Sequence, residues 1–354
     1  MQIDRLLLAA RKAGASDLHI VAGVPPALRV NGEILMANAD SLTQEETKNL
    51  TYQLLSENQR AAFEREQGLC VSIFHTAVGR VRLTAYYHAG NVEASIRLCN
   101  LEIPTSEELG LPPIVDELTR RSGGLLLVTG PTGVGKTTTL NYMVDLINRE
   151  RRCKIVAIED PVEYVHTPKR AIIVQQEVHT DTPSFAKALV HVLRQDPDII
   201  VIGEMRDLDT IETALVAAET GHMVIATLHT PNVEQTVERI VGVFPAERQN
   251  QVMLQLTASL IGILAQRLLP RADRKGRVLA TEILVATTAV RNIIREGNHH
   301  LLVSSMQTGT RDGMRTMDAV LEDLYQKGTI TWDTALSNAR DQDMFQRKRK
   351  ATVH

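Results

Sequence analysis

Residues 130–137 combine glycines, a lysine and a hydroxyl group at a spacing that can bind a nucleoside triphosphate. They read Gly-Pro-Thr-Gly-Val-Gly-Lys-Thr and fit the pattern G-x-x-x-x-G-K-[ST] at every position. In such a loop the backbone N–H groups turn toward the β-phosphate, and the N-terminus of the next helix adds its positive end. We expect Lys136 to reach the β- and γ-phosphates of ATP and the Thr137 hydroxyl to bind Mg²⁺.

The residues on both sides of this loop supply the context that the motif needs. Residues 125–128 are an apolar run typical of a buried strand, and residues 138–141 open a helix. The alternative, a glycine-rich turn that binds nothing, does not explain why strand, loop and helix occur together. The predicted nucleotide-binding residues are Gly130, Pro131, Thr132, Gly133, Val134, Gly135, Lys136, Thr137 and Thr138.

A carboxylate at the end of a second apolar run is the first candidate for metal binding and catalysis. Residues 199–202 are continuously apolar, and Gly203 and Glu204 follow them. In nucleotide hydrolases an acid at such a strand end lies near Mg²⁺ and the attacking water. The aspartate that usually precedes the glutamate is Gly203 here, so Glu204 must supply the metal-side carboxylate alone or share that function. The structural alternative is that Glu204 only caps a strand.

A third run ends in several acids within the segment Ile-Glu-Asp-Pro-Val-Glu at residues 158–163. Ligands of open parallel sheets bind at the carboxyl ends of the strands, so these acids are expected at the same edge as the phosphate loop. Glu163 is the second candidate for orienting the attacking water, whereas Glu159 is the better candidate for a structural acid. A purely structural role remains an alternative for this whole segment.

Two histidines bracket the next apolar run. His222 precedes residues 223–228, and His229 follows them. A histidine at a strand end can sense the γ-phosphate or stabilise a neighbouring carboxylate, although a lone histidine is more often only a satisfied polar residue. Since no cysteine or third histidine joins them at ligand spacing, we do not expect them to bind metal.

Arginines form the remaining set of candidates. Arg80 and Arg82 alternate on one face of a predicted strand, and Arg97 lies on the next strand. They are either solvated surface charges or residues that reach the γ-phosphate of a neighbouring subunit. Arg194 and Arg206 flank the strand that ends at Glu204, and they are candidates for coupling the nucleotide state to movement.

The pattern of elements predicts two domains. Residues 1–100 read as a small α+β unit, with a helix at 3–14, capping boxes at Thr43 and Ser56, and strands at 17–21, 27–30, 70–74, 81–87 and 92–98. Three prolines mark residues 101–118 as a linker. Residues 119–354 alternate apolar strands with helices, which predicts a parallel sheet covered on both faces, and the chain is expected to become mostly helical beyond Pro245.

Composition excludes several classes of function. The chain has 354 residues and a formal net charge of −3, so we expect no nucleic-acid binding and no binding to anionic membranes through overall charge. Its three cysteines are widely spaced, which argues against disulfides and zinc and fits a reducing cytosol. No apolar run has the length of a signal peptide or membrane span, so membrane contact is expected only through partners.

Four motifs in order carry a family resemblance: GPTGVGKTTT, IEDPVEYVH, LRQDPDIIVIGEMRD and ATLHT. They resemble the Walker A motif, aspartate box, atypical Walker B motif and histidine box of the type II/type IV secretion ATPase superfamily. The N-terminal stretch ASDLHIVAGVPPALRVNGEI and residues 289–296, which resemble AIRNLIRE, are similar to the retraction ATPases of twitching motility. Departures from the pattern are Thr230-Pro231-Asn232 after the histidine box and the divergent residues 86–100.

The resemblance implies a PAS-like N-terminal domain, a RecA-like P-loop ATPase domain, and a homo-hexameric ring with ATP and Mg²⁺ bound between the two domains. It implies that Arg80, Arg82 and Arg97 approach the phosphates, and that the active site consists of Lys136, Thr137, Glu163, Glu204, His222 and His229. Thr137 and Glu204 become the metal-side residues. Which of Glu163 and Glu204 is the base stays open.

The function that the resemblance implies is an ATP-hydrolysing motor that powers type IV pilus retraction and twitching motility. Its implied partners are an inner-membrane platform protein and the pilus machinery, and its implied place is the cytoplasmic face of the inner membrane at the pilus base. One alternative is a nucleotide-gated regulatory module with negligible hydrolysis. Another is a pilus-assembly or secretion ATPase of the same superfamily, although those relatives carry a further N-terminal domain and often a tetracysteine loop.

Overall fold

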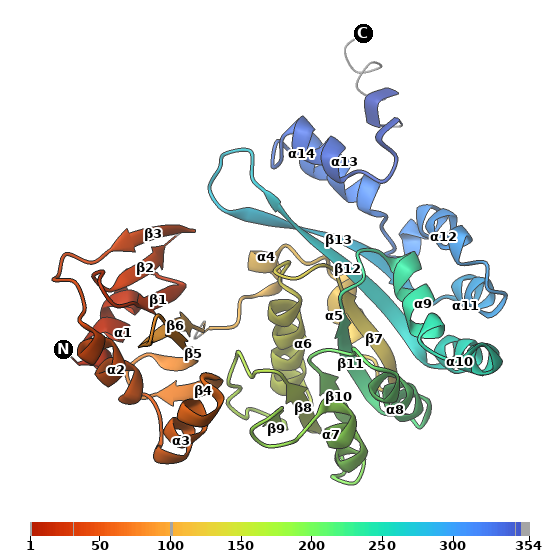
Figure 1. The fold of residues 1–354 in the computed structure, drawn as a ribbon. Helices are drawn as coiled ribbons and strands as arrows, with labels where there is room; N and C mark the ends of the chain where they lie inside the picture. Colours follow the sequence, from red (N-terminus) through yellow and green to blue (C-terminus); the bar gives the residue numbers. More distant parts are fainter. Residues whose placement is uncertain (1, 31, 100–101, 344, 348–354) are drawn as a thin grey trace. The chain divides into compact units, whose positions relative to one another are not determined.

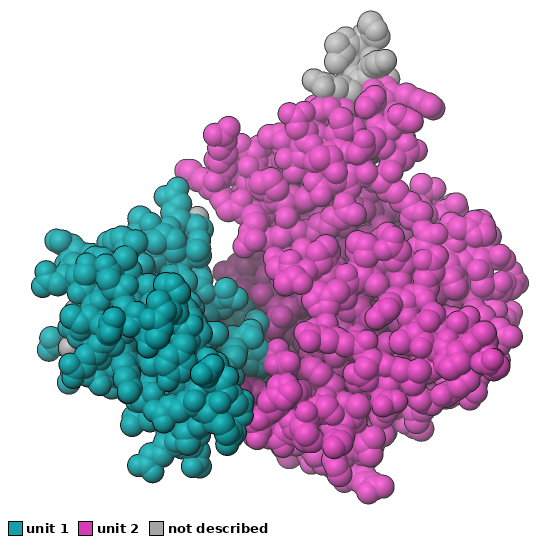
Figure 2. Space-filling model, viewed as in Figure 1, with its two compact units in different colours: residues 1–102, 161–165 teal, residues 103–160, 166–354 magenta. Residues whose placement is uncertain are grey.

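The structure is a computed structural model that describes residues 2–30, 32–99, 102–343 and 345–347. The chain forms two compact units. Unit 1 comprises Met1–Glu102 together with Pro161–Val165, and unit 2 comprises Ile103–Asp160 and His166–His354 (Figure 2). The segment Pro161–Val165 therefore lies between two stretches of unit 2 in the sequence but belongs to unit 1.

Unit 1 is an antiparallel sheet covered by helices (Figure 1). Its helices α2 and α3 begin at the capping boxes of Thr43 and Ser56, as the sequence predicts. The apolar faces of helices and strands enclose a core that includes Leu7, Phe63 and Leu83. The elements are α1 (Ile3–Lys12), β1 (Asp17–Ile20), β2 (Ala27–Val30), β3 (Glu33–Met36), α2 (Gln44–Tyr52), α3 (Glu57–Glu66), β4 (Gly68–His75), β5 (Gly79–His88) and β6 (Asn91–Leu98), with the strand order β3-β2-β1-β6-β5-β4.

A two-residue turn sets the register of the central hairpin of unit 1. Ala89 and Gly90 both have positive φ, 49° and 81°, which is the backbone of a type I′ turn between β5 and β6. With His88 opposite Asn91, this register places Arg82 directly opposite Arg97. The hairpin therefore brings two of the predicted arginines to one face of the sheet.

Unit 2 contains a seven-stranded sheet whose order is β13-β12-β7-β11-β10-β8-β9 (Figure 1). All neighbouring strands are parallel except β13, which runs antiparallel to β12 at one edge. The strands are β7 (Gly124–Thr129), β8 (Lys154–Glu159), β9 (Ile172–Glu177), β10 (Ile199–Ile202), β11 (Met223–Leu228), β12 (Leu260–Pro270) and β13 (Arg277–Val285). The predicted α/β class, a RecA-like domain preceded by an α+β unit, is confirmed.

Helices cover both faces of this sheet because every second residue of the buried strands points to the opposite face. Leu125 and Leu127 of β7 lie in one apolar cluster, whereas Leu126 and Val128 lie in another. The first face is covered by α7 (Phe185–Val192), α8 (Leu208–Glu219), α9 (Val233–Gly242), α10 (Ala246–Ser259), α11 (Thr288–Arg295) and α12 (Leu302–Thr308). The second is covered by α5 (Ile114–Thr119) and α6 (Lys136–Glu150).

Unit 2 also contains one short helix before α5 and two helices near the C-terminus. α4 (Ser106–Leu109) precedes α5, while α13 (Met317–Gln326) and α14 (Trp332–Asn338) pack with residues of β12 and β13 in a smaller apolar cluster. No described helix combines the length and the apolar character that a membrane span needs.

The structure corrects the predicted linker at residues 101–118. Residues 103–118 belong to unit 2 and carry α4 and α5, and Leu111, Val115 and Leu118 are buried in its core; residues 100–101 lie outside the described residues. The prolines misled the prediction, because Pro112 and Pro113 stand at the start of α5, where the missing N–H of proline leaves no helical bond unmade.

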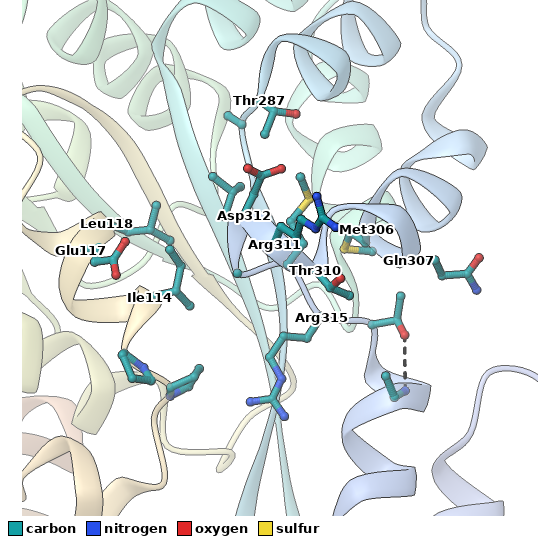
Figure 3. Close-up of a pocket in the computed structure, with 18 of the residues that line it drawn as sticks. Ile114, Glu117, Leu118, Thr287, Met306, Gln307, Thr310, Arg311, Asp312 and Arg315 are labelled. Atoms are coloured by element: carbon teal, nitrogen blue, oxygen red, sulfur yellow. Dashed lines mark hydrogen bonds between the residues drawn. The ribbon is translucent and has the colours of Figure 1, made fainter.

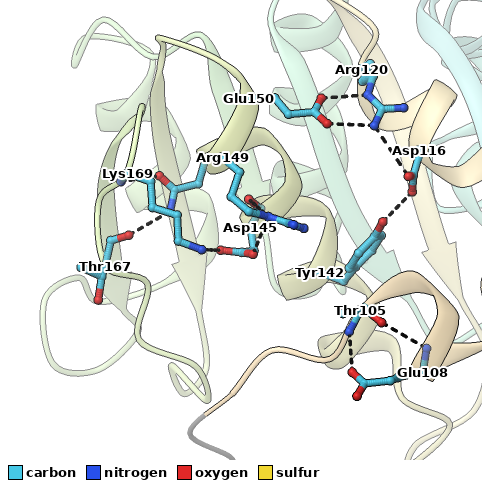
Figure 4. A network of polar contacts seen from close by, with 11 residues as sticks. Thr105, Glu108, Asp116, Arg120, Tyr142, Asp145, Arg149, Glu150, Thr167 and Lys169 are labelled. Atoms are coloured by element: carbon cyan, nitrogen blue, oxygen red, sulfur yellow. Dashed lines mark hydrogen bonds and ion pairs between the residues drawn. The ribbon is translucent and has the colours of Figure 1, made fainter.

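Polar contacts fix α5 and the preceding segment against α6, the helix that follows the phosphate loop (Figure 4). Arg120 donates from Nε and Nη2 to the two carboxylate oxygens of Glu150 at 2.8 and 2.9 Å. The Tyr142 hydroxyl donates to Asp116 Oδ1 at 2.7 Å. A bidentate arginine–carboxylate pair at one end of α6 and a tyrosine near its middle hold the helix in one position.

Glu282 of β13 ties two helices to the sheet, which gives a stability prediction. Its side chain is 5% exposed and accepts hydrogen bonds from the backbone N–H groups of Val233 and Met317, the first residues of α9 and α13. Removal of the carboxylate leaves two buried donors without a partner. We therefore expect Glu282→Ala to lower the free energy of unfolding, measured by urea unfolding, by about 2–4 kcal/mol. The control is Glu247→Ala, which changes an exposed glutamate. Equal stability of the two variants would contradict the role of Glu282 in holding the two helices.

Candidate active site

The glycine loop between β7 and α6 has the backbone that phosphate binding requires. Three glycines of the loop have positive φ values: 139° at Gly130, 82° at Gly133 and 89° at Gly135. Residues other than glycine rarely adopt such values. A Cβ atom at Gly130 would lie 2.5 Å from the carbonyl oxygen of Gln266 on the neighbouring strand β12. Thr137 and Thr138 follow in the first turn of α6, so the predicted loop residues stand at the junction of strand and helix.

Lys136 folds back into this loop. Its Nζ donates to the carbonyl oxygens of Gly130 and Pro131 at 2.8 and 3.0 Å and contacts His229 Nδ1 at 3.3 Å. Burial lowers the pKa of Lys136, and the charge of Glu204 opposes this shift. The ammonium group is thus held by three acceptors inside the loop, where phosphate oxygens can replace the carbonyl oxygens.

His229 joins the lysine to the acid that follows β10. Its Nε2 lies 2.8 Å from Glu204 Oε1. A lysine ammonium can only donate, so Nδ1 of His229 accepts from Lys136 and its proton lies on Nε2, which donates to the carboxylate. The parallel neighbours β10 and β11 end side by side, and this is why Glu204 and His229 meet.

The close packing of strand ends also explains the glycine before Glu204. A Cβ atom at Gly203 would lie 3.2 Å from the carbonyl oxygen of Ile158 on β8, which leaves little room for a side chain. The Thr227 hydroxyl donates to Gly203 O at 2.5 Å, and Met205 N donates to Thr227 O at 2.9 Å. These two bonds hold the segment that carries Glu204 against the end of β11.

Glu204 is kept ionised by its donors. Burial raises the pKa of this carboxyl, but hydrogen bonds from Arg206 and His229 and the charge of Arg206 outweigh burial, and the net effect lowers the pKa. Arg206 Nη2 lies 2.6 Å from Glu204 Oε2. A carboxylate that stays charged suits metal binding better than proton abstraction.

This geometry predicts a pH effect. In wild type the pKa of Glu204 lies below the ordinary value of a glutamate, partly because of the hydrogen bond and charge of Arg206. Removal of Arg206 should therefore raise the pKa of Glu204, so that the carboxylate becomes protonated at a higher pH. We expect the acidic limb of the pH profile of kcat/KM for ATP to move to higher pH in Arg206→Ala than in wild type. The exposed Arg239→Ala is the matched control, and identical acidic limbs in all three proteins would rule out this role of Arg206.

Within unit 1 the structure brings Glu163 together with two of the predicted arginines. Burial raises the pKa of the Glu163 carboxyl, and the charges of Arg82 and Arg97 oppose that shift. Arg97 also pairs with Asp17 through Nε and Oδ1 at 2.9 Å, and Arg82 Nε contacts Cys70 Sγ at 3.2 Å. Arg80 lies on β5, two residues before Arg82 and thus on the same face.

The structure places His222 at the opposite end of β11 from the phosphate loop of the same subunit, so its expected role in the active site stays a prediction. His222 precedes β11 and His229 follows it, and a strand of 6 residues spans roughly 20 Å. The ring of His222 contacts Ala217 O and Thr220 Oγ1 at 3.1 and 3.2 Å, at the end of α8. The two ends of β11 lie at opposite ends of the sheet. Of the two histidines, therefore, only His229 contacts Lys136 and Glu204.

Several polar residues around the loop were not predicted. Gln266, which is 0% exposed, donates from Nε2 to Thr139 Oγ1 of α6 at 2.8 Å. Asn141 donates from Nδ2 to the Thr137 carbonyl at 2.9 Å, and buried His166 contacts Asn141. His166 ends the quoted aspartate-box stretch, which is the only sequence signal that could have found it. Glu159, assigned a structural role, is buried and accepts from Gln175 Nε2 at 2.8 Å.

The side chains present fit a magnesium–nucleotide site. Among the described residues, no group of three or more histidine, cysteine, aspartate or glutamate side chains could hold a metal by itself. Mg²⁺ bound with a nucleotide typically takes one or two protein oxygens, and phosphates and waters complete its shell. The Thr137 hydroxyl and the ionised Glu204 carboxylate are oxygen donors of this kind.

A separate cavity of about 1000 Å³ lies in unit 2 and has a different lining (Figure 3). Its walls come from α5, the residues after β13 and residues 306–316, with Ile114, Leu118 and Arg315 among them. None of the predicted site residues lines it. The cavity therefore does not define the nucleotide site, which rests on the loop, Lys136 and the strand-end residues.

Unit 2 is an α/β domain with a glycine loop between β7 and α6 and with an acid and a histidine at neighbouring strand ends. The chain belongs to the family described as "Type II/IV secretion system protein", whose sequence profile matches residues 93–336. This confirms the resemblance to the secretion ATPase superfamily. Proteins of this family are ATPases, and the match covers more than half of the chain.

Individual relatives match over nearly the full length. The type IV pilus retraction ATPase PilT of Pseudomonas aeruginosa is 42% identical over 345 residues, which cover 98% of this chain and 100% of the relative. The type IV pilus ATPase PilU of the same organism is 40% identical over 96% of this chain and 89% of PilU. A crystal structure of the pilus retraction motor PilT with bound ADP matches with a TM-score of 0.93 and 45% identity, covering 98% and 99% of the two chains.

Proposed function

We propose that the chain is an ATP-hydrolysing, homo-hexameric motor that powers type IV pilus retraction and twitching motility. The observation that carries the proposal is the connected set Lys136–His229–Glu204 at the glycine loop, in a chain that resembles the ADP-bound retraction motor throughout its length. Lysine, neutral histidine and ionised acid converge where the γ-phosphate and its Mg²⁺ bind in P-loop ATPases.

The two glutamates receive different roles in this proposal. Glu204, whose pKa is lowered overall, acts with Thr137 on the metal side; bound Mg²⁺ supplies neutralisation of the phosphate charge. Glu163, whose pKa burial raises, is the base that orients the attacking water and accepts its proton. A carboxylate with a raised pKa is the better proton acceptor at neutral pH.

The arginines of unit 1 are assigned to charge stabilisation. Arg80, Arg82 and Arg97 lie on the paired strands β5 and β6 of unit 1, which also contains segment 161–165. The charges of Arg82 and Arg97 act on Glu163. We assign them to the γ-phosphate of a neighbouring subunit in the ring, where an arginine contributes a large factor in rate. His222 receives no role at the phosphates of its own subunit.

The proposed work of the ring follows from differential binding. A γ-phosphate that contacts residues of two neighbouring subunits favours one arrangement of the ring, and hydrolysis removes that preference. Sequential firing around the ring would turn an inner-membrane platform protein and disassemble the pilus. The protein would then act in the cytoplasm at the base of the pilus.

Complementation tests this function. The full-length chain is expressed in a type IV pilus strain that lacks its own retraction ATPase, and twitching and pilus retraction are recorded. We expect wild type to restore both and Lys136→Ala to restore neither. Expression of soluble, ATP-hydrolysing protein without any retraction would contradict the proposal, and recovery of surface pili in a strain lacking its assembly ATPase would support the assembly reading.

The similarity to PilU supports a second candidate, an accessory ATPase of the same pilus system. The two candidates differ in what they can do alone. A principal motor restores retraction in a strain that lacks both PilT and PilU, whereas an accessory ATPase restores it only when PilT is present.

A further inference from the structure

The chain crosses between its two units on either side of Glu163, and the return point is firmly anchored. It leaves unit 2 after Asp160, contributes Pro161–Val165 to unit 1, and re-enters unit 2 at His166. His166 is only 7% exposed. A buried histidine at the end of a segment that carries a proposed base calls for a physical explanation.

His166 is bonded to the helix that follows the phosphate loop. Its Nε2 lies 2.7 Å from Asn141 Oδ1, and Asn141 Nδ2 donates to the backbone carbonyl of Thr137 at 2.9 Å. A carbonyl only accepts, so the amide nitrogen of Asn141 must face Thr137, and its oxygen must face His166. His166 therefore donates from Nε2, and a relay runs from the return point to the residue that carries the proposed metal-binding hydroxyl.

The state of the ring agrees with this direction. Burial lowers the pKa of His166 to about 4, so the imidazole is neutral at physiological pH. Nδ1 is buried and has no hydrogen-bond partner among the described residues. The only bond of the ring is thus the one to Asn141, and it fixes the tautomer with the proton on Nε2.

The same face of α6 holds the residues that follow His166. Asn141, Asp145 and Asn148 lie at positions i, i+4 and i+7, on one side of the helix. Asp145 Oδ1 pairs with Lys169 Nζ at 2.6 Å, and Asn148 donates from Nδ2 to Thr167 O at 2.9 Å (Figure 4). The segment that follows His166 is thereby held along two turns of the helix that follows the phosphate loop.

Gln175 of β9 connects both ends of the crossing. Its Nε2 donates to Glu159 Oε1 at 2.8 Å, just before the segment leaves unit 2. Its Oε1 accepts from the backbone N–H of His166 at 3.0 Å, where the segment returns. One side chain therefore fixes the exit and the return of the segment that carries Glu163.

We infer that His166 and Asn141 are positioning residues for ATP hydrolysis, which anchor the first turn of α6 at Thr137 to the point where the chain re-enters unit 2. The inference rests on the proposed ATPase function. Neither residue needs to touch the nucleotide: the pair holds the turn that carries the metal-side hydroxyl in one position within unit 2. Such a device affects the rate of the chemical step more than the affinity for nucleotide.

Three variants of the full-length chain test this inference. His166→Phe keeps the ring size but removes the Nε2 donor, His166→Gln keeps an N–H donor at a similar reach, and His299→Phe changes another partly buried histidine as a matched control. We expect kcat for ATP to fall by about ten- to a hundredfold in His166→Phe, with the Kd for ADP within about twofold. We expect substantial recovery of kcat in His166→Gln and unchanged kinetics in His299→Phe.

A double-mutant cycle separates positioning from simple structural damage. Asn141→Ala removes the same link without touching the ring, so the combination with His166→Phe should cost little more than either change alone. Asn141→Ala also serves as the test if His166→Phe does not fold. Additive losses would overturn the inference, as would equal kcat in His166→Phe and wild type, or equal losses in kcat and ADP affinity without rescue by glutamine. Absence of turnover in the wild type would instead overturn the proposed function, and the inference with it.

Discussion

Lys136→Ala is expected to reduce ATP turnover by on the order of a hundred- to a thousandfold, the usual effect of removing one preorganised donor from a developing negative charge. The ammonium of Lys136 already makes three contacts within the loop, to Gly130, Pro131 and His229. Alanine supplies none of them, and it leaves the Thr132 hydroxyl, at 3.3 Å, as the remaining donor to Nδ1 of His229. The γ-phosphate then loses the positive charge of the lysine.

The measurement is steady-state release of phosphate by the purified full-length protein, with thermal unfolding recorded in parallel. Lys275→Ala is the control, because Lys275 is an exposed lysine outside the site. We expect that control to match wild type and Lys136→Ala to keep a wild-type circular dichroism spectrum. Turnover within threefold of wild type in Lys136→Ala would refute the role of the loop lysine.

Glu204→Gln is expected to lower kcat by on the order of a hundred- to ten-thousandfold while the protein still binds nucleotide. The substitution removes the charge that is placed near Mg²⁺. In wild type the two carboxylate oxygens face two donors, Arg206 Nη2 at 2.6 Å and His229 Nε2 at 2.8 Å. Glutamine replaces one of these oxygens by an NH₂ group, which cannot accept a hydrogen bond from the donor that faces it.

Single-turnover kinetics and ADP binding distinguish this loss from unfolding. Glu212→Gln is the matched control, since Glu212 also pairs with an arginine, Arg248, but lies on α8 away from the loop. If Glu204→Gln bound ADP normally and hydrolysed ATP at the wild-type rate, Glu204 would have no part in catalysis. If it failed to bind any nucleotide, its role would be in the architecture of the loop.

Much of the ATPase-like unit was predictable because the relevant signals are local. The glycine pattern, the apolar strand before it and the helix after it fix the loop within a few residues. Strand β7 contains the predicted apolar run, and α6 follows the loop as predicted. Glu204 and His229 were predictable as neighbours because parallel strands end at one sheet edge.

Other elements depend on contacts that no local pattern reveals. Strand β12 was missed, since an apolar run directly after a helix reads as either helix or strand until its neighbours are known. The residues 103–118 contain prolines and mixed polarity but form part of the core. His222 has the same residue type and strand-flanking position as His229, and only the direction of β11 separates them.

The link between His166 and Asn141 was likewise outside the reach of sequence reasoning. Both residues are polar in predicted elements or motifs, and their partnership spans 25 positions of the chain. Both residues are buried, and the hydrogen bond from Asn141 to the Thr137 carbonyl orients the Asn141 amide toward His166. Only the folded chain provides these two features. The membership of Pro161–Val165 in unit 1 is of the same kind, because it is a property of packing.

The most direct measurement is a single-turnover experiment in which an excess of the purified full-length protein is mixed with labelled ATP, with and without Mg²⁺. We predict that the protein captures the ATP and converts it to ADP and phosphate only when Mg²⁺ is present. Recovery of intact ATP after prolonged incubation with Mg²⁺ would contradict the motor assignment, and bound but unhydrolysed ATP would instead identify a nucleotide-gated regulatory protein.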